Sequence, residues 1–534
     1  MPTLAGWLTG EQVPQEIIEQ TLTTMGSVLE VHGGRPTRIV QPGAGLVTYS
    51  DPAYSVQKNT EPPMLDWVPD RRTMVYRRPL SGAHLLYYVE DWPAEGNLLF
   101  ASEIKALLAV GVPRRLHLAA LHALLHYGFI PAPWTTFQNV HAVPAGSILR
   151  WQRGKTVVNA STDYYLDDPL SGTDLLDQLH TLLDETTAAL LPPHEQLVAL
   201  TDGGEASALA IALTARHTET SFTVAALGYK KNMKAAESIA SACQRPFLAI
   251  TGVDQPEFWI ATLAATEAPC LHSMPLAFHQ LLHTVSAETG ARVAISGLGG
   301  SRVTAKGTIR GSRATGVEHP LWGRGNRFIE HVVAPTQIRS DFLPSHIWSK
   351  DAAQSISQET PWEETLHARK LARQAAKFSN AWQQQYYLDL HLHLPDFIVG
   401  TAQQLATAER MVIRSPYLAS DVMNMFIRLP AVLSDGTPRE EKLSALAQRY
   451  MPNVIAGQST SSLEAPTMSL LRVADSELLQ QTISQEALRA TGIFDPEVVQ
   501  DLLRQGEQED GVVTRELVLV FTTQLLCQLF EVGM

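Results

Sequence analysis

Residues 197–207 constrain the fold more than any other segment, because they predict a buried strand, a tight turn and a helix in succession. Four apolar residues precede Gly203 and Gly204, and residues 206–216 have the pattern of a helix. A sharp turn from strand to helix presents free backbone N–H groups, which is a general phosphate-binding geometry. The sequence therefore predicts an anion-binding loop, in which Asp202 nevertheless places a negative charge.

Further strand-like runs alternate with helical ones after this loop. They occupy residues 222–227, 246–250 and 292–296, and from about residue 360 the pattern is mostly helical. Alternating strands and helices predict a doubly wound parallel sheet, with ligands at the carboxyl ends of its strands. The second half is therefore predicted to be a parallel α/β domain with a helical tail.

Short apolar runs separated by turns predict antiparallel sheets in the first half. These runs are residues 43–49, 73–77, 85–89, 97–101 and 147–151. One clear helix, residues 118–127, interrupts them. We therefore expect a multidomain α/β chain, with an antiparallel β sandwich over residues 1–165 and the α/β domain over residues 185–534.

The composition limits the classes of partner. Lysine and arginine number 41 against 54 aspartates and glutamates, so the formal net charge of the 534 residues is −13. That charge argues against nucleic-acid and acidic-membrane partners. Three cysteines are too few for a disulfide framework, and no run is long enough to span a membrane. We expect a cytoplasmic protein.

Two other features have a structural and a functional interpretation. Residues 301–327 carry six lysines and arginines against Glu318 alone, which suits a solvated loop or a basic lid over an anionic ligand. His122 and His126 lie four apart on a predicted helix, and a second pair, His391 and His393, alternates with leucines. We interpret both pairs as structural and predict no metal site.

Several segments, in order along nearly the whole chain, carry a family pattern. They are Met1-Pro-Thr-Leu-Ala-Gly6, Arg78-Pro-Leu-Ser-Gly-Ala-His-Leu-Leu-Tyr-Tyr88, Phe100-Ala-Ser-Glu-Ile-Lys-Ala-Leu107, Val143-Pro-Ala-Gly146, Ser296-Gly-Leu-Gly-Gly-Ser301 and Arg414-Ser-Pro-Tyr-Leu418. Together they resemble the asparagine synthetase B superfamily, which includes β-lactam synthetases and lasso-peptide cyclases. The resemblance implies an N-terminal Ntn-type glutaminase domain and a C-terminal ATP-pyrophosphatase synthetase domain.

The N-terminal domain departs from this pattern at its nucleophile. In the family an N-terminal cysteine releases ammonia from glutamine, with its own α-amine as the base. Here position 2 is Pro2, and Thr3 is not at the terminus. We therefore expect no glutaminase activity and a domain kept for packing.

For the second domain, the resemblance implies roles residue by residue. Thr201, Gly203, Gly204 and Ser207 would hold pyrophosphate, and Glu205 would replace the metal-binding aspartate, whose place is taken by Ala206. The nucleotide side would be lined by Ser296 and Gly297, and the catalytic cations would be Arg414 and Lys442. ATP and Mg²⁺ are thus the cofactors that the resemblance suggests.

Other family positions have lost the groups that this chemistry uses. Ser301 replaces a second metal aspartate, Val412 replaces an acidic residue, and residues 456–462 lack the family's catalytic lysine. These losses favour a degenerate pseudo-synthetase that acts as a scaffold or regulatory subunit. It would form a homo- or hetero-oligomer, with an active paralogue or a peptide substrate as the partner. The alternative is a divergent ATP-dependent ligase that forms asparagine, a lactam or a macrolactam through an acyl-adenylate.

Overall fold

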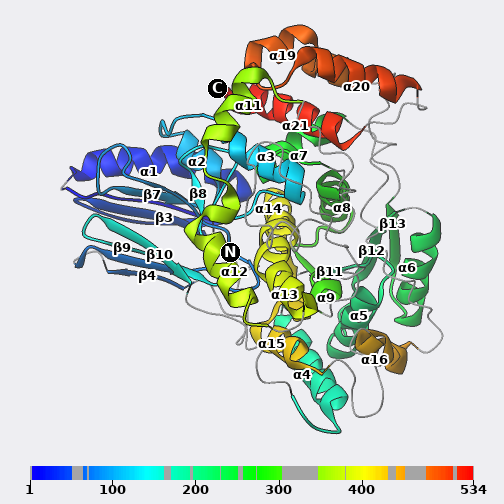
Figure 1. The fold of residues 1–534 in the computed structure, drawn as a ribbon. Coiled ribbons are helices and arrows are strands. Elements are labelled where there is room, and N and C mark those ends of the chain that lie inside the picture. The colour runs from blue at the N-terminus through cyan, green and yellow to red at the C-terminus, as the bar shows by residue number, and fades with distance from the viewer. Residues whose placement is uncertain are drawn as a thin grey trace.

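The computed structural model places two antiparallel sheets in the N-terminal half and one parallel sheet, with helices around it, in the C-terminal half (Figure 1). It describes residues 3–11, 13–50, 64–68, 71–160, 170–192, 196–228, 230–250, 256–271, 274–303, 347–378, 381–430, 441–451, 477–508 and 514–532. Pro2, residues 456–462 and all but the first three residues of the 301–327 segment lie outside these ranges.

The N-terminal sheets have the orders β2-β3-β1-β7-β6-β8 and β10-β9-β5-β4, and every pairing within them is antiparallel. Their strands are β1 (Thr3–Leu8), β2 (Arg35–Gln41), β3 (Ala44–Ser50), β4 (Met64–Val68), β5 (Thr73–Arg77), β6 (Tyr87–Glu90), β7 (Leu98–Ala101), β8 (His141–Ala142), β9 (Ser147–Gln152) and β10 (Lys155–Ala160). The predicted antiparallel sandwich is confirmed.

Alternation along β1 builds both faces of the six-stranded sheet. Leu4 and Leu8 point into the space between the two sheets, whereas Ala5 and Trp7 point the other way, as a period of two requires. The outer face is covered by α1 (Gln15–Leu29) and α2 (Ile104–Leu108). These two helices were not predicted; α3 (Leu118–Tyr127), by contrast, has the predicted bounds.

The C-terminal sheet is parallel, with the order β13-β12-β11-β14-β15. Its strands are β11 (Leu197–Leu200), β12 (Thr223–Leu227), β13 (Phe247–Ile250), β14 (Val293–Ser296) and β15 (Val412–Arg414). Val198 and Ala199 belong to different buried clusters on opposite faces, so helices cover both sides of the sheet. The doubly wound α/β prediction is confirmed, and the short strand β15 adds a member that was not expected.

The helices of this half account for most of its remaining described residues. They are α4 (Leu175–Leu190), α5 (Glu205–His217), α6 (Lys230–Ala242), α7 (Pro256–Thr266), α8 (Met274–Thr289), α9 (Gly300–Val303), α11 (Lys350–Gln358), α12 (Leu366–Ala375), α13 (Ala381–Leu388), α14 (Gly400–Ala408), α15 (Ser420–Arg428), α16 (Lys442–Tyr450), α18 (Glu477–Thr482), α19 (Gln485–Thr491), α20 (Pro496–Gln508) and α21 (Arg515–Phe530). Among the helices of the described ranges, none is long and apolar enough to cross a membrane.

A π-helix, η5 (Asp389–Val399), joins α13 to α14. It contains the His391/His393 pair, whose alternation with leucines suggested one polar and one apolar face. Instead His391 is buried and its Nδ1 lies 2.7 Å from the carbonyl oxygen of Tyr387. The wide turn of a π-helix changes which side chains face the interior, and a period of two does not apply to it.

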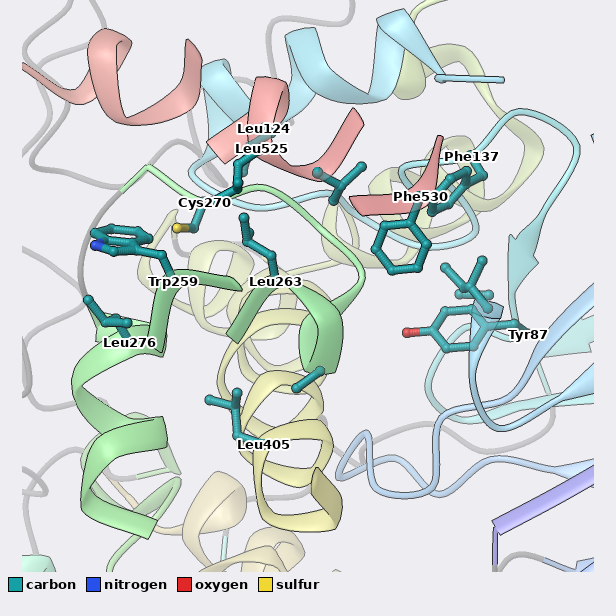
Figure 2. Close-up of a cluster of buried hydrophobic side chains, with 14 of the residues drawn as sticks. Tyr87, Leu124, Phe137, Trp259, Leu263, Cys270, Leu276, Leu405, Leu525 and Phe530 are labelled. Atoms are coloured by element: carbon teal, nitrogen blue, oxygen red, sulfur yellow. The ribbon is translucent and has the colours of Figure 1, made fainter. Parts of the chain in front are cut away.

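The two halves share a hydrophobic core. Figure 2 shows Tyr87 and Phe137 from the N-terminal half near Phe530 of α21, and the Phe137 and Phe530 ring centroids lie 5.6 Å apart. Trp259 and Leu263 of α7 line the same cluster. Because one apolar cluster spans both halves, the N-terminal sheets are part of the packed body of the protein.

A buried ion pair also crosses between the halves. The Arg78 guanidinium lies 3.3 Å from the Asp396 carboxylate in η5 and also donates to the carbonyl oxygens of Gly82 and Val143. Gly82 has φ +83°, and a Cβ added to it would lie 2.3 Å from Cα of Pro395. The joint is therefore closely packed at both a charged and an apolar contact.

Candidate functional site

The predicted anion-binding loop lies where two neighbouring parallel strands end. Leu200 pairs with Ser296 in the register of β11 and β14, so the segment after each strand leaves the same edge of the sheet. The first segment runs into α5, which begins at Glu205, as the sequence predicted within one residue. The chain thus folds into the strand, turn and helix arrangement of an anion site at the carboxyl edge of the sheet.

Hydrogen bonds inside the loop engage the N–H groups of both glycines and the Ser207 hydroxyl. The carboxylate of Asp202 accepts the backbone N–H of Gly204 at 2.8 Å and the hydroxyl hydrogen of Ser207 at 2.7 Å through the same oxygen. The Gly203 N–H donates to the Thr201 hydroxyl oxygen at 3.0 Å, which lies 2.9 Å from the Ser207 oxygen. Asp202 therefore occupies donors that a phosphate oxygen would use.

Close packing beneath the loop fixes its position. A Cβ added at Gly297 would lie only 2.4 Å from the backbone nitrogen of Ser207, so glycine is needed where β14 meets α5. On the other side, the Tyr417 hydroxyl donates to the carbonyl oxygen of Ala206 at 2.8 Å. Ser296 lies at the same edge, where its hydroxyl accepts the N–H of Leu298 at 3.3 Å.

The candidate magnesium ligands are a single buried carboxylate and a hydroxyl. Glu205 is 8% exposed at the start of α5, and Ser301 lies in the short helix α9. Burial, with the nearby Glu205 charge as a second cause, raises the pKa of the Tyr417 hydroxyl. Mg²⁺ is held chiefly by carboxylates, phosphates and water. In the described part of the chain, no three His, Cys, Asp or Glu side chains are placed to hold a metal ion.

The two predicted catalytic cations are both buried and both contact backbone. Arg414 ends β15 and donates to the carbonyl oxygen of Leu190 at the end of α4. Lys442 is fully buried at the start of α16, with its Nζ 3.4 Å from the carbonyl oxygen of Pro430. Since α16 packs against α5, Lys442 lies on the helix layer that carries the loop. Their catalytic roles stay predictions.

A cavity of about 170 Å³ between the two halves was not anticipated as a site. It is lined from the N-terminal half by Thr3, His32, Glu103 and Lys105, and from the C-terminal half by residues that include Arg414. The Glu103 carboxylate bridges His32 and Lys105, each at 2.6 Å. Glu103 and Lys105 stand in the run 100–107 that resembled the family, so that motif was the available signal.

The charges around this cavity are mutually compensated. Burial opposes ionisation of Glu103, but the hydrogen bond from His32 and the charge of Lys105 outweigh it and lower the Glu103 pKa. The charges of Glu103 and Glu267 likewise outweigh burial and raise the pKa of Lys105. For Glu267 burial prevails and raises its pKa to about 7. The cavity wall thus carries the ion-paired cluster of His32, Glu103 and Lys105, and Glu267, outside the lining, connects this cluster to the C-terminal half.

Two family models match the chain and agree with this architecture. Residues 178–528 match the family model described as asparagine synthase, and residues 65–165 match the one described as a glutamine amidotransferase domain. No curated protein matches the chain. Among solved structures, NMN synthetase from Francisella tularensis aligns with 46% of this chain and 97% of its own, at 12% identity and a TM-score of 0.20.

Proposed function

Because the chain belongs to the asparagine synthase family, we propose that it is a member without ligase or glutaminase activity that acts as a scaffold or regulatory subunit. In this role it pairs with an active paralogue or holds a peptide substrate. A cytoplasmic location, without nucleic-acid or membrane partners, fits the net charge of −13.

The observation that carries the proposal is the position of Asp202. Its carboxylate accepts from Gly204 and Ser207, which are the loop's own donors. A phosphate at this loop would have to displace that carboxylate and then lie beside a like charge. One charge pair at ~4 Å is worth about 4 kcal/mol at an effective dielectric constant of ~20, which sets the upper scale of the effect.

The metal ligands support the same conclusion. Adenylation of a carboxylate needs Mg²⁺ to neutralise the departing pyrophosphate. In this chain Ala206 and Ser301 occupy the positions of the family's two metal-binding aspartates. Glu205 is the neighbouring carboxylate that could replace the first of them. The residues present do not fit Mg-ATP, so we derive no adenylation step for this chain.

The N-terminal half fits a packing role. Pro2 offers no thiol for attack on glutamine. Yet Arg78 remains fully engaged with Asp396 and with backbone carbonyl groups at the joint. A domain that has lost its nucleophile while it keeps a buried interface contributes stability and shape.

The decisive experiment is titration calorimetry with Mg-ATP. We expect no binding by the native chain and measurable binding by Asp202→Ser, with a gain of up to roughly a thousandfold in affinity, from ~1.4 kcal/mol per tenfold change. The double variant Asp202→Ser/Ser301→Asp should bind more tightly still, because it regains a metal carboxylate. Neither variant should release pyrophosphate with candidate acids, since neither returns the second lysine, which the family has where this chain has residues 456–462.

The matched control is Asp351→Ser, which removes the same charge from an exposed position on α11. It should leave Mg-ATP binding undetectable. If the native chain binds Mg-ATP at micromolar concentration and Asp202→Ser weakens that binding, Asp202 is a ligand. The alternative, a divergent amide-forming ligase with Glu205 on the metal, would then replace our proposal.

A further inference from the structure

Helix α12 has one buried and one exposed face. Its inner side chains, Ala368, Leu371, Ala372 and Ala375, are buried, and the helix packs against α13. Thr365 fixes its start, because the Thr365 hydroxyl oxygen accepts the N–H of Ala368 at 3.2 Å. The helix, yellow-green in Figure 1, is thus held firmly from one side while its other side faces solvent.

The outer face carries a regular row of side chains, which we term the α12 stripe. Its members are all exposed and are Leu366, Arg369, Lys370 and Arg373; Lys377, also exposed, follows the end of the helix at Ala375. At 100° per residue, spacings of three, four and seven from the first member keep all four within one side of the helix. Leu366 is 79% exposed, more than any other large apolar side chain in the described ranges.

The charge of the stripe is largely uncompensated. Arg369 lies 3.3 Å from Glu364, and within the described residues Lys370, Arg373 and Lys377 form no ion pair. The neighbouring His367 adds no charge, because burial, with the charges of His391 and Lys370, lowers its pKa to about 3. Positive charge is therefore concentrated on one helix of a chain whose net charge is −13.

The fold itself does not need this arrangement. Like charges three and four residues apart on a helix repel one another, and this repulsion offsets the favourable interaction of Arg373 with the C-terminal end of α12. Because Leu366 is exposed, it contributes little of the favourable free energy of apolar burial to the stability of this chain. A row of cations that begins at an exposed apolar side chain, with Arg369 as the member that has an ion-pair partner among the described residues, is what a charged partner with one apolar anchor would require.

We propose that the α12 stripe binds an acidic segment of a partner protein, with carboxylates on Arg373 and Lys370 and an apolar side chain on Leu366. This inference rests on the proposed function, and it identifies the surface of this chain that the partner in that function would contact. Arginine suits carboxylates because its guanidinium can donate two parallel hydrogen bonds. The stripe is about 11 Å long at 1.5 Å per residue, which an extended peptide of roughly four residues spans.

The overall charge favours a short protein segment over other anions. A nucleic acid or an anionic membrane is an extended polyanion. The negative net charge of the whole chain, −13, would repel it. A short acidic peptide touches the stripe alone, and charges beyond a Debye length of about 8 Å are largely screened.

The test uses fluorescence anisotropy of a labelled synthetic peptide with four glutamates followed by a leucine, titrated with the full chain. We expect binding at low salt that weakens as salt is raised. Lys370→Glu/Arg373→Glu should reduce affinity at least tenfold, and Leu366→Ala should reduce it a few-fold. The exchange Lys370→Arg/Arg373→Lys should preserve binding.

The matched control is Lys155→Glu/Lys234→Glu, which changes the net charge equally at two exposed positions on β10 and α6. It should bind the peptide as the native chain does. No binding by the native chain, or an equal loss in the control, would overturn the inference. So would tighter binding of single-stranded DNA or anionic vesicles that the stripe variant abolishes.

The Asp202→Ser chain separates this inference from the proposed function. It should bind the peptide like the native chain, because the loop lies at the sheet edge and α12 carries the stripe. If native protein binds Mg-ATP while the stripe result holds, the non-catalytic proposal fails and the peptide surface stands. If the peptide does not bind while the native loop still rejects Mg-ATP, only the stripe inference fails.

Discussion

The Glu267 carboxylate accepts the backbone N–H of Lys105 at 2.7 Å, from the opposite half of the chain. Its second oxygen accepts the N–H of Ile104 at 2.8 Å. These two N–H groups open α2, so a residue after α7 caps a helix of the N-terminal sandwich. A helix start left without acceptors in a buried place is costly, which makes this carboxylate part of the domain joint.

Truncation of Glu267 should therefore loosen the joint. We expect Glu267→Ala to lower the free energy of unfolding by about 2–3 kcal/mol, because two buried donors lose their acceptor. Glu267→Gln keeps one acceptor and should cost about half as much. Urea titration measures both changes in the free energy of unfolding. The control is Glu237→Ala, at an exposed position of α6. Equal stability of the alanine variant and the control would show that the cap is dispensable.

Gly82 offers a test of the packing at the same joint. Gly82→Ala should destabilise the protein by about 3 kcal/mol, from the left-handed backbone and from overpacking against Pro395. The control is Gly111→Ala, where φ is +95° and the nearest atom to a new Cβ, on the Trp92 ring, is 3.7 Å away, an ordinary van der Waals contact. It should cost only the backbone strain, about 1 kcal/mol. Thermal unfolding that ranks the two variants equally would contradict the close approach.

Glu363 should make stability fall as pH rises. It is 1% exposed, and burial raises its pKa from 4.5 to about 7. The folded chain thus retains a proton that the unfolded chain releases, so stability declines from about pH 4.5 through pH 7. Glu363→Gln should add up to about 3 kcal/mol at pH 8, at ~1.36 kcal/mol per pKa unit, and nothing near pH 4.

Unfolding in urea at both pH values checks this prediction. The control is Glu364→Gln, because Glu364 is exposed and pairs with Arg369 at the surface. It should change stability by less than about 1 kcal/mol at either pH. A gain from Glu363→Gln that is the same at pH 4 and pH 8 would point to packing and not to ionisation.

The purified chain should release no glutamate from glutamine. Pro2 supplies no thiol, and Thr3 is buried in β1. A coupled glutamate assay, with an active glutaminase as the positive control, measures this directly. Hydrolysis that disappears on substitution of Pro2 or Thr3 would contradict the prediction.

Periodicity was sufficient for the long and regular elements of the fold. The apolar run Leu197–Leu200 and the helix Leu118–Tyr127 were predicted with their observed bounds. Strand β15 was missed because Val412–Arg414 is too short to show alternation. The π-helix η5 was missed because its wide turn matches neither the period of a strand nor that of an α-helix.

The candidate site was predictable in its place but not in its internal contacts. The glycines located the loop, and a charge at position 202 was evident from sequence. That Asp202 turns inward onto Ser207 follows from side-chain geometry, which no pattern encodes. Glu267 was missed for a related reason, since its partner at Lys105 is 162 residues away in sequence.

Because its side chain is turned inward, the covalently attached Asp202 carboxylate competes with an external phosphate for the donors of Gly204 and Ser207. An intramolecular group acts at a fixed effective concentration, which dilution of the protein does not reduce. An external phosphate then binds only the fraction of molecules in which Gly204 and Ser207 have released the carboxylate, and its apparent Kd rises in inverse proportion to that fraction. At nucleotide concentrations high enough to enter the native loop, the association rate should therefore level off at the opening rate, whereas with Asp202→Ser it should keep rising.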